Sequence, residues 1–211
     1  MGDDRAGAVR GFSRAAQGYI SVPDVSARLM VAKAVEDLGD ILGRPLEGVP
    51  DKNSDDEVLA ALDFDVADTK EEAGDDPALD RLLPAMSMDE DAAEELRLDS
   101  ERRIRNAKAR HLRDLHAILL SEDERVLVPY GSEPEVLAAL TDVRLLIAER
   151  LDISEPEDIE ALREVYLARD EDYVTESPRA RQTMVLLEVY SFLTWWQDSL
   201  LLAMGEGEIG S

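Results

Sequence analysis

The stretch MVLLEVYSFLTWWQDSLLLAM, residues 184–204, decides the fold of this 211-residue chain. Wound as an α-helix, it is apolar nearly all round. Such a helix is either the buried centre of a helical bundle, or it packs on its own domain with one face and on a partner protein with the other. Both arrangements stay open, because the adjacent Trp195 and Trp196 cannot point in the same direction. For the second arrangement, the candidate partner-binding residues are Tyr190, Trp195, Trp196 and Leu202.

Helix start and stop signals bracket this stretch and recur along the chain. Ser177-Pro178 precedes the last helix and Gly205 follows it, as expected of capping residues. A capping box from Ser21 to Asp24 begins an earlier helix, which ends at Gly43. Similar signals predict helices over residues 77–83, 136–151 and 159–167. A further helix of about thirty residues is expected after a second capping box at 87–90, because neither Gly nor Pro follows until Pro129.

The sequence therefore predicts an all-α fold, a bundle of about six or seven helices joined by short links. The first 22 residues are the exception, because two short extended pieces, residues 8–10 and 18–22, could pair as a small N-terminal β-hairpin. We expect a single domain over residues 1–211, since a chain of this length can bury a substantial core. Residues 205–211 are expected to be a flexible tail.

Residues 48–75 are expected to form a mobile acidic insertion. From Asp51 to Asp76, eleven acidic residues stand against two lysines, a net charge of −9 in 26 residues. So little apolar surface cannot offset the entropy of ordering the segment. A partner-binding role is the alternative interpretation of this insertion.

Composition argues against most kinds of catalytic site. The chain has no Cys and only two His, which leaves no thiolate chemistry and little material for a metal site or a catalytic triad. No Walker A loop, dinucleotide-binding glycine motif, nucleophile elbow or HExxH sequence is present. We therefore expect no enzymatic activity, no cofactor and no metal.

The formal net charge is −25, which repels phosphate backbones and anionic lipids at long range. Nucleic acid is thus an unexpected partner for the molecule as a whole, whereas a protein partner, including a basic one, is compatible with this charge. No apolar run follows a basic start at the amino terminus, and none is long enough to span a bilayer. We expect a cytoplasmic protein with no membrane partner.

One segment carries the opposite charge. Between Arg97 and Arg113, seven Lys and Arg stand against two acidic residues, a local balance of +5. On a helical wheel the segment is amphipathic, with basic side chains outside an apolar stripe. Acidic residues one turn upstream could neutralise these side chains along the helix. The alternative is an exposed basic face that binds DNA, for which the candidates are Arg102, Arg103, Arg105, Arg110 and Arg113.

The two histidines lie in the same segment. His111 falls at the centre of the apolar stripe, which predicts a buried neutral imidazole bonded to a neighbouring helix. His116 is five residues further on and points elsewhere, so the pair does not form an HxxxH metal clip.

Four phrases together resemble a known family. They are DPALDRLLP (76–84), DAAEELR (91–97), LTDVRLLIAERLD (140–152) and YSFLTWWQDSL (190–200). In this order they resemble an actinobacterial family of helical proteins of formerly unknown function, whose genes often neighbour that of the ClpS protease adaptor. Some members are described as AosR-like oxidative-stress transcriptional regulators. The resemblance covers most of the chain except the acidic stretch from about residue 48 to 74.

The resemblance implies a cytoplasmic regulator that acts in transcription through contact with the transcription apparatus. This chain departs from a thiol-based sensor, because without Cys it cannot detect oxidants through a disulfide. The expected function is a non-enzymatic regulatory protein that works through protein contacts. The alternatives are a DNA-binding regulator that uses the basic face, and a purely structural interaction module. The protein partner could also be a second copy of this chain, which would make a homodimer.

Overall fold

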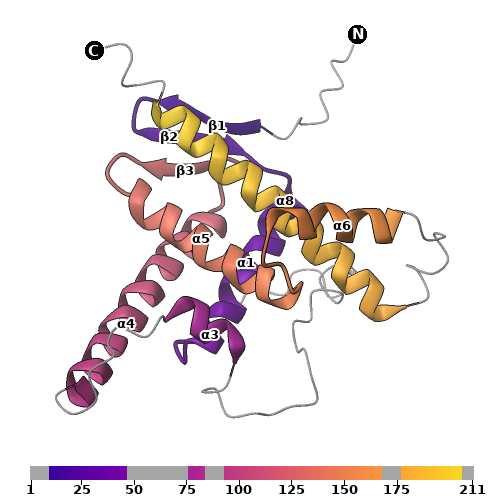
Figure 1. Cartoon of the computed structure of the whole chain (residues 1–211). Coiled ribbons are helices and arrows are strands. Elements are labelled where there is room, and N and C mark those ends of the chain that lie inside the picture. The colour runs from indigo at the N-terminus through magenta and orange to yellow at the C-terminus, as the bar shows by residue number, and fades with distance from the viewer. Residues whose placement is uncertain (1–9, 47–75, 84–92, 168–176, 206–211) are drawn as a thin grey trace, which may run out of the picture.

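The structure, a computed structural model, describes residues 10–46, 76–83, 93–167 and 177–205. These residues are mostly helical, as predicted, with a small antiparallel sheet beside the helices (Figure 1). The helices are α1 (Val25–Ile41), α3 (Pro77–Leu82), α4 (Ala93–Leu119), α5 (Glu133–Arg150), α6 (Pro156–Leu167) and α8 (Pro178–Gly205). The strands are β1 (Arg10–Ala15), β2 (Gly18–Val22) and β3 (Val126–Pro129). The predicted insertion (48–75) and the predicted tail beyond Gly205 lie outside the described residues.

The sheet corrects the all-α prediction. The predicted hairpin is present, but its first strand covers residues 10–15 instead of 8–10. A third strand, β3, pairs antiparallel with β2, so the order in the sheet is β1-β2-β3. Strand β3 has only four residues, VLVP, which are too few for an alternating pattern to predict a strand from the sequence.

Gly18 allows β2 and β3 to approach each other. Its φ is +154°, and a Cβ at this position would lie 2.0 Å from the carbonyl oxygen of Val128. No side chain fits such a contact, so glycine is required at the start of β2.

Ser21 and Asp24 do not form the predicted capping box, in which the Ser21 hydroxyl would cap the helix and the Asp24 carboxylate would bond back to Ser21. Asp24 alone caps α1, because its Oδ1 accepts a 2.8 Å hydrogen bond from Ser26 N. Ser21 lies in β2, where its hydroxyl donates to the Arg10 carbonyl at 2.7 Å and accepts from Trp196 Nε1 at 2.8 Å. The predicted end of α1 is confirmed, with Gly43 at φ +64° just beyond it.

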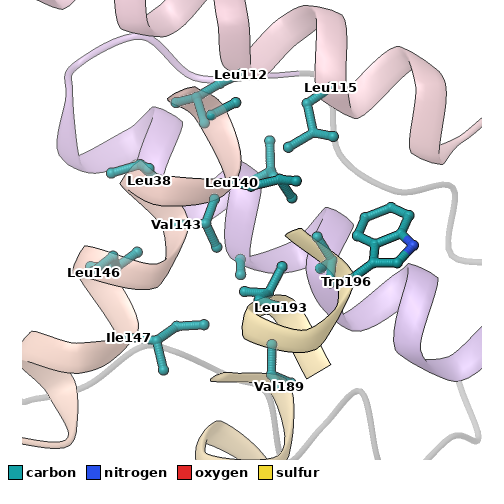
Figure 2. Close-up of a cluster of buried hydrophobic side chains, with 14 of the residues drawn as sticks. Leu38, Leu112, Leu115, Leu140, Val143, Leu146, Ile147, Val189, Leu193 and Trp196 are labelled. Carbon is teal, nitrogen blue, oxygen red and sulfur yellow. The ribbon is translucent and has the colours of Figure 1, made fainter. Parts of the chain in front are cut away.

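The core lies against one side of α8, within the apolar stretch 184–204. Helix α8 packs against β1, α5, α1 and α6. Figure 2 shows Leu193 and Trp196 of α8 facing Leu140 and Val143 of α5, with Leu115 of α4 nearby. All five side chains are at most 1% exposed, so their apolar surface stabilises the fold.

Arg28 ties the end of α4 to α1. Its guanidinium donates hydrogen bonds to the backbone carbonyls of Leu119 and Ser121, and through Nη1 at 2.6 Å to that of Asp123. The last carbonyls of a helix have no partner within the helix. Arg28 therefore caps α4 from outside and fixes the turn that leads into β3.

Candidate binding surfaces

Two of the four predicted partner-binding residues are exposed on the C-terminal half of α8. Trp195 is 43% exposed and Leu202 is 70% exposed. They lie seven residues apart, two turns along the same side of the helix, with exposed Asp198 between them. Leu201 is 48% exposed on the flank. We call Trp195, Asp198, Leu201 and Leu202 the α8 face.

Trp196 does not belong to any surface. It is 1% exposed, and its ring stacks on Phe12 with centroids 5.0 Å apart and on Phe192 at 5.5 Å. Its Nε1 hydrogen bond to Ser21 satisfies the only polar group of the indole. The structure therefore corrects the prediction for Trp196, which is a core residue.

Tyr190 also lies away from the α8 face. Its half-buried ring lies under the guanidinium of Arg144 from α5, 5.4 Å from the ring centroid. Arg144 Nη1 donates to Gln197 Oε1 at 2.9 Å, and Gln197 Nε2 donates to Thr141 Oγ1 at 2.8 Å. Tyr190 thus takes part in a polar contact between α5 and α8.

The backbone of β1 supports the α8 face from behind. Phe12 N donates to Ser199 Oγ at 3.0 Å, and Ser199 Oγ donates to the Trp196 carbonyl at 2.7 Å. A Cβ on Gly11 would lie 3.4 Å from Cζ2 of Trp195 and 2.8 Å from the Ser199 side chain. Glycine at position 11 therefore lets α8 approach the strand closely at Ser199.

The five predicted basic-face residues separate into two groups. Arg102, Arg103, Arg110 and Arg113 are exposed on the outer side of α4. Arg105 is half-buried and turned away, and its Nε and Nη2 donate to Glu101 Oε1 at 3.0 and 2.8 Å. The predicted pairing along the helix therefore occurs for Arg105, and also for Arg103, which lies 2.7 Å from Asp99 at the surface.

The histidine prediction is wrong about which imidazole is buried. His111 is half-buried, whereas His116 is 8% exposed, with its Nε2 lying 2.8 Å from Glu36 Oε1 of α1. Helix α4 faces the core with Leu112, Leu115 and Leu119, so its buried stripe is turned by about one residue from the predicted one.

A second buried contact joins α4 to α5. Lys108 Nζ lies 2.5 Å from Asp142 Oδ1, and Asp142 is 4% exposed. Burial raises the pKa of the Asp142 carboxyl above its ordinary value, and the hydrogen bond from Lys108 acts in the opposite direction. Asp142 Oδ2 has no hydrogen-bond partner among the described residues.

Burial also raises the pKa of Asp37 on α1, to about 6, against the lowering influence of Lys33 2.8 Å away. Asp37 and Asp142 are thus each held by a lysine of their own. Within residues 10–46, 76–83, 93–167 and 177–205, no three His, Cys, Asp or Glu side chains come together in a way that could hold a metal ion. No helix in these ranges is both long and apolar enough to cross a bilayer.

Comparison with known proteins identifies the family. The model of a domain of unknown function, DUF2017, matches residues 9–204, and the chain belongs to this family. No curated protein and no solved structure matches the chain.

Proposed function

We propose that this member of a family of unknown function is a non-enzymatic regulatory protein that acts by binding another protein through the α8 face. The exposure of Trp195 and Leu202 on a helix whose opposite side is core carries the proposal. Exposed large apolar side chains that lie close together mark binding surfaces, and Trp is among the residues most enriched in binding hot spots.

The charge of the protein indicates the chemistry of the partner. Asp198 lies exposed between Trp195 and Leu202, and the net charge of the chain is −25. A partner segment that offers an apolar anchor flanked by Lys or Arg would gain both burial and long-range attraction. We therefore expect a basic, amphipathic segment of a partner protein on this face.

The rigid support of the α8 face favours such binding. Helix α8 is held to β1 through Ser199, and Trp196 anchors it in the core. A surface that is already ordered loses little entropy when a partner binds.

The contacts of the described titratable residues support a role without catalysis. Glu36 faces His116, and Asp142 faces Lys108, in pairs that join helices inside the fold. These groups stabilise the arrangement of α1, α4 and α5, and the proposal gives them no part in chemistry on a substrate.

The resemblance to AosR-like regulators supports a finer proposal. The process would be the transcriptional response to oxidative stress in the cytoplasm, with a component of the transcription apparatus as partner. Because the chain has no Cys, the proposed regulation works by contact and not by thiol oxidation. A homodimer or a purely structural interaction module would use the same α8 face.

Site-specific photo-crosslinking in cells that produce the protein tests the proposal. The photoreactive residue p-benzoylphenylalanine replaces Leu202 in one variant and Val25 in a control, because Val25 at the start of α1 is equally exposed at 68%. We expect a discrete crosslinked partner from position 202 that is absent from position 25. A product containing two copies of the chain would identify a homodimer. Identical adducts from both positions, or none from position 202, would contradict the proposal.

A further inference from the structure

The outer side of α4 carries a row of arginines that the α8 face does not explain. Arg102, Arg103, Arg110 and Arg113 are exposed within about 100° of the helix surface and span about 16 Å along its axis. Asn106 lies between them, and Arg44 from the turn after α1 donates to Asn106 Oδ1 from Nε at 3.3 Å and from Nη2 at 3.2 Å. We call the five arginines, Arg44, Arg102, Arg103, Arg110 and Arg113, the arginine strip.

The arginine strip has few acidic neighbours. Arg103 lies 2.7 Å from Asp99, but the two side chains are 81% and 49% exposed, so water weakens the pair. Within the part of the chain that the structure describes, Arg102, Arg110 and Arg113 form no ion pair. Acidic residues outnumber basic ones by 48 to 23 in this chain. Three neighbouring arginines on one helix face thus keep their positive charge available to an external anion.

Inward-facing basic residues of the same region are paired. Arg105 forms a salt bridge with Glu101 on its own helix, and Lys108 forms one with Asp142 on α5. Arg150 bonds Asp76 through Nη1 at 3.0 Å and Nη2 at 2.5 Å. The arginine strip differs from these buried or half-buried pairs, because its guanidinium groups are exposed to solvent.

We propose that the arginine strip is a docking surface for an acidic segment of a partner protein. A planar guanidinium binds a carboxylate through two parallel hydrogen bonds, which a lysine cannot do. A segment of about five extended residues covers the length of the strip. This surface is separate from the α8 face, although the inference rests on the proposal that the chain works through protein contacts.

A nucleic-acid duplex fits the arginine strip less well. The strip is one helix face wide and is bordered by Glu101 and by exposed Asp114. A duplex would also bring its phosphates towards a molecule with a net charge of −25. A narrow acidic peptide can contact the arginines and, because it carries fewer negative charges than a duplex, it meets less of this repulsion.

The scaffold under the arginine strip tolerates changes at the surface. The opposite side of α4 is fixed by Leu112 and Leu115, both 0% exposed, and by His116 against Glu36. Neutral substitutions of the outer arginines therefore leave the core intact.

Fluorescence anisotropy tests the inference with two labelled probes on the full chain. One probe is a twelve-residue peptide of alternating Glu and Ser, and the other is a 20-base-pair DNA duplex. The strip variant combines R102Q, R110Q and R113Q. The control variant combines R125Q, R163Q and R179Q, which changes the net charge by the same amount at exposed positions outside α4. Circular dichroism checks that both variants fold.

We expect the peptide to bind the unchanged protein at about 50 mM salt, where screening is weak. Its affinity should fall about tenfold in the strip variant, since three exposed charge pairs are lost, and less than about twofold in the control. Tighter strip-dependent binding of the duplex would overturn the inference in favour of nucleic acid. Absence of peptide binding, or an equal loss in both variants, would also overturn it. None of these outcomes changes the crosslinking at position 202, so the two proposals fail separately.

Discussion

Glu36 Oε1 lies 2.8 Å from His116 Nε2, in a buried contact that joins α1 to α4 across 80 positions of sequence. The two residues are 9% and 8% exposed. A polar pair at this depth holds the two helices in one relative position, because any shift would leave a buried polar group without its partner. The core of this protein is thus fixed by a few specific polar contacts as well as by apolar packing.

Removing one member of this pair should destabilise the fold. We expect H116A to lower the free energy of unfolding by about 2–3 kcal/mol, because Glu36 loses a buried hydrogen-bond partner. The control is H111A on the same helix, where the side chain is half-buried. Urea unfolding followed by circular dichroism measures both. An effect of H116A no larger than that of H111A would show that the contact contributes little.

Asp37 should make stability depend on pH in the opposite direction from an ordinary salt-bridged carboxylate. Its pKa is raised to about 6 in the folded protein, so folding favours the protonated form. The stabilisation is complete below the unfolded pKa near 4 and is lost as the pH rises through about 6.

We therefore expect D37N to stabilise the protein at pH 7.5 by about 1–3 kcal/mol and to have almost no effect near pH 4. Urea unfolding of both proteins at the two pH values measures the difference between their free energies of unfolding. The contributions of the other carboxyl groups are the same in both proteins and cancel in this difference. A D37N effect that stays the same at both pH values would contradict the raised pKa.

The two adjacent tryptophans should respond differently to the same substitution. W196A should cost about 3–5 kcal/mol, because it removes a fully buried ring. W195A should cost less, because the Trp195 side chain is 43% exposed. Fluorescence of W195F and W196F reports the environment of the tryptophan that remains. We expect strong acrylamide quenching only in W196F, where exposed Trp195 is left. Equal quenching in the two variants would place both rings in similar surroundings.

Gly18 should not tolerate a side chain. G18A would place its Cβ 2.0 Å from the Val128 carbonyl oxygen, so β3 must separate from β2. We expect a loss of at least about 2 kcal/mol. G43A is the matched control, because Gly43 has φ +64° but nothing within 4 Å of its Cβ position, which limits the cost to about 1–2 kcal/mol of backbone strain. Thermal unfolding ranks the two variants, and an equal effect would argue against the close contact.

The sequence predicted several helix ends well and helix rotation less well, although α5 and α6 each begin three residues before the predicted positions 136 and 159. The ends of α1, α3 and α8 follow from Gly43, Asp76 and Ser177-Pro178, because caps act on their own backbone. The rotation of α4 depends on which of several apolar side chains meets α1 and α5. That choice is tertiary, so the sequence predicts a buried His111, whereas His116 is the buried histidine in the structure.

At the candidate surfaces too, contacts within one helix could be predicted from the sequence, whereas contacts between distant elements could not. The adjacent tryptophans were predicted to point in different directions, and both were candidates for partner binding. Only the positions of Phe12 and Ser21 decide that Trp196 is a core residue. Likewise, the spacing along α4 predicted the Arg105–Glu101 pair, which lies within a single helix. Arg44 on Asn106 joins positions 62 residues apart, and no local pattern could predict this contact.

The hydrogen bonds from Arg28 to the end of α4 have a consequence for binding by two surfaces at once. Arg28 fastens α4 to α1, and α1 packs against α8. The arginine strip and the α8 face therefore lie on helices that are joined through α1, which favours a fixed distance between the two surfaces. A partner that engages one surface would meet the other at a high effective concentration without ordering a linker. Two weak contacts of opposite charge preference would then act as one selective contact, which a partner with only a basic or only an acidic segment could not reproduce.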